Sequence, residues 1–442
     1  MGKVIILALC LLVATATSKS HSNSEHWKQK ILGQTRRPEK TFSQAGKSPF
    51  PVDSRHGYVR INDDGSDIFY WLFRANNAPE TAPLLIWFTG GPGCSSQLAL
   101  LFENGPFNIS ETGEMGLNPS GWNDKAHLLF IDQPVGTGLS HSSFNDLSRS
   151  EISVANNMVA FFERFYDLYP EFKNKGLYLA GESFAGNYLP HISNALIKKA
   201  LPYIDLKGVA IGNGWTNPGL QYPQYAEYAI DPENAPFTKF TQDKYNKLVP
   251  QLEVCKNLVL YNRWRMNGIA SEFCGSLNDQ ILAKGVNLYD IRKPCNFPLC
   301  YDFRSIVSFM NSQPVMSELQ SDKFWSPCGG SRAGSELSRH EFINSAFKKL
   351  PYVLESGVTV LIYNGDKDYI CNWMGSDVWT RDLQWSGKEE FNKAKIVPEG
   401  TFGTSRTYKN FKFLRVFNAG HMVPHDQPQY ALQMINEFMG FK

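Results

Sequence analysis

The chain has 442 residues, of which 42% are apolar, 19% charged and 13% aromatic. These proportions are typical of a folded globular protein, and they exclude the disordered, collagen-like and coiled-coil classes. The 44 Lys and Arg residues against 42 Asp and Glu give a net charge of +2 with no basic stripe, so nothing points to nucleic acid as a partner. The length predicts two or three domains, or one large α/β domain with an insertion.

Residues 1–18 predict a secretory signal peptide. Lys3 supplies a positive start, an apolar run extends from Val4 to Ala14, and Ala14–Thr15–Ala16 is a small-residue cleavage pattern. A membrane anchor is the alternative, but the run is too short to span ~30 Å of hydrocarbon as a helix. We therefore expect no membrane attachment after signal removal. The expected location is the secretory pathway, with secretion and delivery to a lysosome or vacuole both open.

A polar, basic leader follows at residues 19–47. The pair Arg36–Arg37 fits a processing site, and the whole segment equally fits a plain N-terminal extension. The sequence does not decide between the two.

Cysteine usage agrees with secretion. Seven cysteines lie outside the signal peptide, and an odd number in an oxidising compartment predicts one unpaired thiol. The cysteines lack the spacing of a zinc site, and we expect no metal. Asn108 begins the one N-x-S/T sequence without an intervening proline, so it is the predicted glycosylation site.

The apolar runs predict an α/β fold. They are continuous rather than alternating, as expected for strands of a parallel sheet covered on both faces. Helical spacing of apolar residues appears between them and at the C-terminus. The expected architecture is a doubly wound, mostly parallel sheet, with strands at 83–88, 127–131, 176–180, 206–211, 358–363 and 411–417 and helices at 151–169, 186–200 and 427–439.

This rhythm fails between residues 215 and 347. The segment is rich in proline and polar residues and holds several of the cysteines, which predicts an inserted cap subdomain. The sheet domain would then be divided into residues 48–214 and 348–442, with the cap covering the active site.

Residues 181–186 read Gly-Glu-Ser-Phe-Ala-Gly, a Gly-x-Ser-x-Gly pattern between a predicted strand and a predicted helix. That context is typical of a nucleophile elbow, which holds a serine hydroxyl exposed above the sheet. Ser183 is the candidate nucleophile, and it needs a base and an acid. Later strands end at Asp366, Asp368 and His421, which gives the chain order Ser, Asp, His of an α/β-hydrolase. His425, in the same loop, stays unassigned.

Four blocks of sequence, at residues 87–96, 181–186, 364–375 and 420–424, resemble the serine carboxypeptidase family, and the likeness extends from about residue 50 to 440. The resemblance implies an α/β-hydrolase fold with a triad of Ser183, Asp368 and His421, while Asp366 would be structural. It also implies an oxyanion hole made by the backbone N–H groups of Gly91 and Phe184.

The family recognises the free carboxylate of its substrate through residues that match Thr89, Gly90, Glu103 and Glu182. Thr89 departs from the family pattern, which has asparagine there. Two glutamates can face an anion only when they are protonated, so we expect raised pKa values and binding that weakens towards neutral pH. The resemblance places Phe102, Tyr289, Tyr301 and Met422 in the leaving-residue pocket, and Phe184 and Ile370 beside the acyl-side pocket.

The resemblance further implies disulfides Cys94–Cys328, Cys255–Cys274 and Cys295–Cys300, with Cys371 free beside the site and sensitive to mercurials. It implies an enzyme without metal or organic cofactor that removes one C-terminal residue, preferably hydrophobic, from peptides at acidic pH. The alternatives are an acyltransferase that uses the same triad and a non-catalytic protein that binds and protects partners. Family members are often homodimers, and this sequence leaves that question open.

Overall fold

The computed structural model describes residues 49–143, 146, 148–261, 267–329 and 331–441. The predicted signal peptide and the leader up to residue 47 lie outside this part of the chain. None of the helices in the described ranges is both long and apolar enough to cross a membrane.

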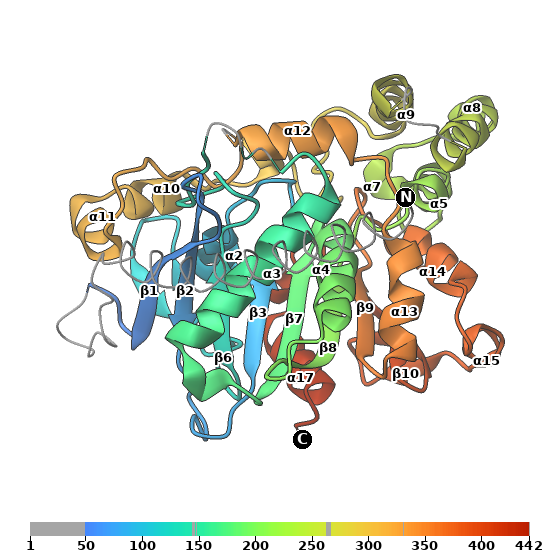
Figure 1. Ribbon diagram of the computed structural model, residues 1–442. Helices are drawn as coiled ribbons and strands as arrows, with labels where there is room; N and C mark the ends of the chain where they lie inside the picture. The colour runs from blue at the N-terminus through green and yellow to red at the C-terminus, as the bar shows by residue number, and fades with distance from the viewer. Residues whose placement is uncertain (1–48, 144–145, 147, 262–266, 330, 442) are drawn as a thin grey trace, which may run out of the picture. The chain divides into compact units, whose positions relative to one another are not determined.

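The main sheet has ten strands in the order β1-β2-β6-β3-β7-β8-β9-β12-β11-β10 (Figure 1). The six strands from β6 to β12 in this order are parallel to one another, and the strands outside them at both edges pair antiparallel. The predicted mostly parallel α/β sheet is therefore confirmed. The strands of this sheet are β1 (Ser54–Arg60), β2 (Asp67–Phe73), β3 (Leu84–Phe88), β6 (His127–Ile131), β7 (Gly176–Glu182), β8 (Asp205–Gly212), β9 (Thr359–Gly365), β10 (Val397–Glu399), β11 (Gly403–Tyr408) and β12 (Phe411–Val416); β4 (Phe107–Ile109) and β5 (Met115–Leu117) form a separate pair.

Strand β3 shows why the apolar runs have no alternation. All five of its residues are buried, and successive side chains point to opposite faces of the sheet. Leu84 and Ile86 belong to one hydrophobic cluster, whereas Leu85 and Trp87 belong to a second cluster on the other side. Both faces are covered, so both sets of side chains must be apolar.

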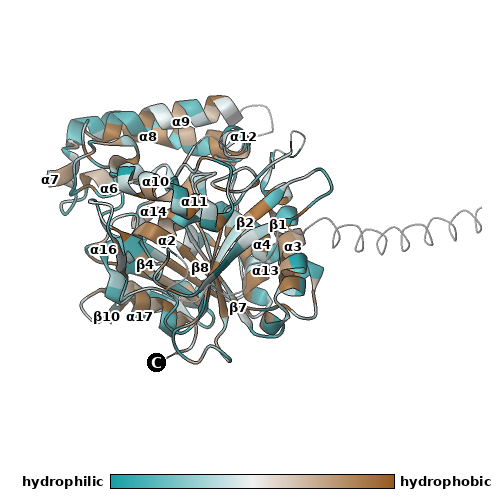
Figure 2. Cartoon of the chain, turned by 90° about the vertical axis from the view of Figure 1, so that its left-hand side faces the viewer, coloured by the Kyte–Doolittle hydropathy of each residue, from teal (hydrophilic) through white to brown (hydrophobic). Residues whose placement is uncertain are grey.

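Helices cover these two faces. Figure 1 shows α3, α4 and α13 on one face of the sheet and α2 and α17 on the other, and the strands between them carry the hydrophobic colour in Figure 2. The helices flanking the sheet are α2 (Ser96–Phe102), α3 (Glu151–Leu168), α4 (Ala185–Lys199), α13 (Leu350–Glu355), α14 (Trp373–Asp382), α15 (Lys388–Lys393), α16 (Val423–Asp426) and α17 (Pro428–Phe438), with a 3₁₀ turn at Pro170–Phe172.

Local sequence sets the limits of α3. Ser150 caps its N-terminus in a reciprocal capping box with Ser153, and Pro170 follows its end, where it can start a new turn but cannot continue the old helix. Its buried face includes Val154, Met158 and several phenylalanines at helical spacing.

The described residues between β8 and β9 form helices and contribute no strand to the sheet. Several of these helices lie along the upper edge of the sheet in Figure 1. The boundaries at residues 215 and 347 stay a prediction. The helices of this segment are α5 (Pro218–Gln221), α6 (Gln224–Ile230), α7 (Ala235–Thr238), α8 (Gln242–Leu260), α9 (Asn267–Ile281), α10 (Arg304–Met310), α11 (Gln313–Leu319) and α12 (Arg332–His340), with 3₁₀ turns at Pro298–Cys300 and Phe347–Lys349.

Candidate active site

The candidate catalytic residues meet where parallel strands end. Ser183 follows β7, Asp368 lies in the loop after β9, and His421 lies in the loop after β12. The carboxyl ends of parallel strands share one edge of a sheet, which is where open α/β sheets bind ligands. Ser183 and His421 line a cavity of about 280 Å³ at this edge, and Asp368 is buried behind His421.

Ser183 has the geometry expected of a nucleophile elbow. Its φ angle is +64°, a left-handed conformation that is uncommon for residues other than glycine. The neighbouring strand β3 leaves no room for a side chain at Gly181, where a Cβ would lie 2.4 Å from the carbonyl oxygen of Phe88. This close approach explains the glycine, and the turn places Ser183 on the cavity wall.

Asp368 orients His421. The imidazole Nδ1 lies 2.8 Å from Asp368 Oδ2, which also accepts a 2.7 Å hydrogen bond from the Asn213 amide. Asp368 is fully buried and His421 is 3% exposed. This pairing fixes the tautomer that leaves Nε2 free to take a proton. Asp366 instead faces Lys367 and Arg415.

Within the described residues no hydrogen bond joins Ser183 Oγ to His421. Nε2 of His421 lies 3.9 Å from Glu182 Oε1. Catalytic hydrogen bonds are often long without substrate and tighten when substrate binds.

The loop after β3 lies directly against the elbow. A Cβ at Gly90 would be 2.4 Å from the backbone nitrogen of Phe184 and 2.7 Å from Ser183 Cβ. In the described part of the chain, the N–H groups of Gly91 and Phe184 donate to no protein acceptor. Two unpaired N–H groups beside a candidate nucleophile suit the oxyanion of a tetrahedral intermediate.

Glu103 and Glu182 form a buried pair beside the triad. Their exposed fractions are 6% and 4%, and the two carboxyl groups lie close enough to interact directly. Burial raises the pKa of Glu103 to about 8, with a further contribution from the negative charge of Asp426. Burial, and then the charge of Glu103, raises the pKa of Glu182. The pair therefore holds protons at acidic pH, as its proposed role towards an anion requires.

Thr89 lies at the cavity with its hydroxyl already engaged as an acceptor. The indole Nε1 of Trp87 donates to Thr89 Oγ1 at 2.9 Å. The hydroxyl proton is still available to donate, because the bond from Trp87 uses only a lone pair. Thr89 can thus give one hydrogen bond to a substrate carboxylate.

Most of the cavity wall is apolar. Of the residues expected in the two pockets, Tyr289, Tyr301, Met422, Phe184 and Ile370 line the cavity. Leu98 also lines the cavity, and the lining residues that the sequence did not single out are Trp215, Tyr225, Leu299, Phe303 and Phe342.

Phe102 does not line the cavity. Its ring stacks on the imidazole of His425 with centroids 4.1 Å apart, and it packs edge to face against Tyr301 at 5.7 Å. Phe102 therefore supports the cavity wall through its contact with the lining residue Tyr301. This stacking also gives His425 a place in the fold outside the triad.

The structure contains the disulfides Cys94–Cys328, Cys255–Cys274 and Cys295–Cys300, which are the pairs implied by the resemblance, and Cys371 is a buried free thiol. Cys371 also lines the cavity. Asn108 lies exposed on β4, where a glycan would meet solvent.

Ligand atoms of Asp368, Cys371 and His421 lie within 4.8 Å of one another, which would suit a metal ion. Two facts argue against that role here. Asp368 and His421 are already hydrogen-bonded to each other, and burial raises the pKa of the Cys371 thiol, so the thiolate that a metal needs is disfavoured.

Comparison with known proteins agrees with this geometry. Residues 44–440 match the family model described as serine carboxypeptidase. The chain is 39% identical over 396 residues to serine carboxypeptidase-like 49 of Arabidopsis thaliana, covering 87% of this chain and 76% of that protein. It is 33% identical to carboxypeptidase Y of Schizosaccharomyces pombe over 413 residues, covering 87% of this chain and 40% of that protein.

Among solved structures, the chain is similar to Kex1Δp, a prohormone-processing carboxypeptidase from Saccharomyces cerevisiae. The TM-score is 0.78 at 27% identity, covering 90% of this chain and 94% of that one. The chain belongs to the serine carboxypeptidase family of hydrolases.

Proposed function

We propose that this protein releases a single C-terminal residue from peptides, through an acyl-enzyme on Ser183, at acidic pH. The observation that carries the proposal is the presence of two devices in one cavity. One is the Ser183, Asp368 and His421 arrangement, and the other is the buried Glu103–Glu182 pair.

In the first step Ser183 Oγ attacks the carbonyl carbon of the last peptide bond while His421 Nε2 takes its proton. The developing negative charge on the carbonyl oxygen is stabilised by the N–H groups of Gly91 and Phe184. His421 then protonates the leaving amine, and a water molecule, activated by the same imidazole, hydrolyses the ester. Asp368 Oδ2 keeps its hydrogen bond with His421 Nδ1 and stabilises the imidazolium.

The free carboxylate of the leaving residue is held by donors only. Thr89 Oγ1 and the Gly90 N–H each supply one proton, and the Glu103–Glu182 pair supplies its own while it is protonated. An endopeptidase substrate has no carboxylate here, so these groups explain why the enzyme would act at chain ends.

The wall predicts apolar residues on both sides of the cleaved bond. On the acyl side, the Phe342 ring stacks on the Phe184 ring with centroids 6.0 Å apart. The backbone carbonyl of Phe342 accepts a 2.6 Å hydrogen bond from Trp215 Nε1. On the leaving side, Tyr289, Tyr301 and Met422 support a hydrophobic C-terminal residue. Burying such residues contributes roughly 1.5–3 kcal/mol each.

The test is the release of leucine at pH 5 from an N-blocked Phe-Leu dipeptide, compared with the release of leucinamide from the matching amide. Strong preference for the free acid, together with loss of activity in Ser183→Ala, supports the carboxypeptidase. If neither compound is cleaved, an N-blocked phenylalanine ester and an acceptor alcohol distinguish an acyltransferase, which forms a new ester, from a protein without catalysis.

A further inference from the structure

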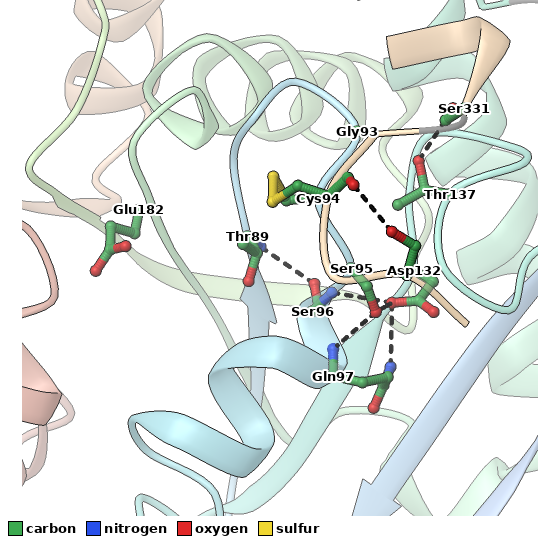
Figure 3. The surroundings of a disulfide bond; sticks show 12 residues. Thr89, Gly93, Cys94, Ser95, Ser96, Gln97, Asp132, Thr137, Glu182 and Ser331 are labelled. Atoms are coloured by element: carbon green, nitrogen blue, oxygen red, sulfur yellow. Dashed lines mark hydrogen bonds between the residues drawn. A yellow bond between two sulfur atoms is a disulfide. The ribbon is translucent and has the colours of Figure 1, made fainter. Parts of the chain in front are cut away.

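Asp132 is a buried acidic residue that contacts the loop beside the active site and does not belong to the triad. It follows β6 and is fully buried. Its Oδ1 accepts hydrogen bonds from Ser95 Oγ at 2.7 Å, the Ser96 N–H at 2.9 Å and Gln97 Nε2 at 3.3 Å (Figure 3). Its Oδ2 accepts the Leu139 N–H at 2.8 Å. Every polar neighbour donates, so an ionised carboxylate satisfies all of them.

Three of these donors, Ser95, Ser96 and Gln97, form the start of α2, and they connect to the loop 89–96. Ser96 Oγ accepts the Thr89 N–H at 3.1 Å, and the Cys94 N–H donates to the Gly90 carbonyl at 3.1 Å. A carboxylate at a helix N-terminus is favourable because the orphan N–H groups and the helix dipole face it. Asp132 thereby fixes both ends of the loop that presents the N–H groups of Gly90 and Gly91.

The same carboxylate links this loop to the segment before Cys328. The indole of the buried Trp325 donates to Ser95 Oγ at 2.8 Å, so one hydroxyl bridges Asp132 and Trp325. Lys323 donates to the carbonyls of Gly136 and Ser140 at 2.7 and 2.8 Å. Burial raises the pKa of Asp132, and the hydrogen bonds it accepts and the positive charge of Lys323 oppose that shift.

We propose that Asp132 is a positioning residue for the oxyanion loop, holding the Gly91 N–H in line with the Phe184 N–H through the start of α2. This inference rests on the proposed function of Ser183 and Gly91. Asparagine at position 132 keeps the shape of the side chain but replaces one carboxylate oxygen with an NH₂ group. Both oxygens of Asp132 accept hydrogen bonds from N–H or O–H groups. Donor then faces donor, and the start of α2 must shift.

The experiment measures Asp132→Asn with an N-blocked phenylalanine ester, which has no free carboxylate, and counts active sites by complete labelling with a fluorophosphonate. We expect kcat/KM per labelled site to fall about 10- to 100-fold, the range for a displaced oxyanion donor or reacting group. The inhibition constant of N-blocked phenylalanine aldehyde, whose hemiacetal oxygen occupies the oxyanion hole, should rise by the same factor.

Asp377→Asn is the matched control, because Asp377 is half-buried in an ion pair with Arg406 away from the cavity. It should lower stability and leave both constants per labelled site unchanged. If Asp132 has only a structural role, Asp132→Asn will also leave both constants per labelled site unchanged and will only reduce the number of labelled sites. That result would overturn the proposal.

If Asp132→Asn does not fold, Ser96→Ala decides, since it removes only the hydroxyl that accepts the Thr89 N–H. A fall of about fivefold in kcat/KM per labelled site supports the proposal, and a value within about twofold of the unchanged protein overturns it. The unchanged protein and Ser183→Ala are measured first. An inactive unchanged protein, or an active Ser183→Ala, refutes the proposed function itself.

Discussion

The buried Glu103–Glu182 pair predicts how substrate recognition responds to pH. Burial holds the pKa of Glu103 at about 8, so about one carboxyl in a thousand is ionised at pH 5, about half at pH 8 and about nine in ten at pH 9. The ionised form repels the substrate carboxylate and does not bind it. The KM for a free-acid dipeptide should therefore be flat below about pH 7, then rise about twofold by pH 8 and about tenfold by pH 9.

The assay follows KM from pH 5 to 9 for N-blocked Phe-Leu and for its amide. The amide has no carboxylate, so its KM should not show this rise. In Glu103→Gln/Glu182→Gln neither side chain can ionise, and the KM for the acid should become independent of pH. A KM for the acid that stays constant in the unchanged protein up to pH 9, or that rises equally for the amide, refutes the reasoning.

Three further predictions concern single positions. Cys371→Ser should keep the activity and abolish inhibition by a mercurial, because Cys371 is the free thiol of the described residues and lines the cavity; inhibition that persists contradicts this. Thr89→Asn adds a second hydrogen-bond donor worth about 1 kcal/mol. The preference for the free acid over the amide, measured as the ratio of their kcat/KM values, should therefore increase about fivefold. An unchanged ratio counts against a role of this position in carboxylate binding. Burial, helped by the charge of Glu341, raises the pKa of Glu151 above its ordinary value of 4.5, so the stabilising contribution of this group is present at lower pH and is lost as pH rises through the folded-state pKa. Glu151→Gln should therefore reduce the fall in Tm between pH 5 and 7.5 by about 2 °C or more, as calorimetry can measure. An equal fall in Tm in both proteins would show that Glu151 does not contribute.

The central strands were predictable because their requirements are local. The runs at residues 84–88 and 127–131 are apolar throughout, and only a strand covered on both faces needs that pattern. The limits of α3 were likewise readable from a periodic apolar face and a following proline.

The antiparallel edges were missed. β1 and β2 pair from Ser54 with Phe73 to Arg60 with Asp67, and the polar stretch at residues 62–65, which ends in a glycine, is the hairpin signal that could have identified them. β2 has a continuous apolar run like the central strands, although it pairs antiparallel on both sides. Apolar content reports burial and does not report strand direction.

In the candidate site, too, some residues could be predicted from the sequence and others could not. Ser183 directly follows β7 and His421 lies in the loop after β12, so their meeting at one sheet edge could be inferred. Trp215 and Phe342 reach the cavity from opposite ends of the helical segment, and their contact depends on how that segment packs, which no local pattern encodes. The packing of Phe102 against Tyr301, outside the cavity lining, is an outcome of the same kind.

The proposed catalytic residues and several residues of the cavity wall come from different parts of the chain, and this has an evolutionary consequence. The proposed triad is supplied by loops that follow sheet strands, whereas Tyr289, Tyr301 and Phe342 come from the segment between β8 and β9. Selection can therefore change which peptides are accepted by substituting or lengthening the insertion, while the bond-breaking groups stay under separate constraint. A fold organised in this way can diversify into many selectivities from one reaction, because substitutions at these lining positions leave the loops of the triad unchanged.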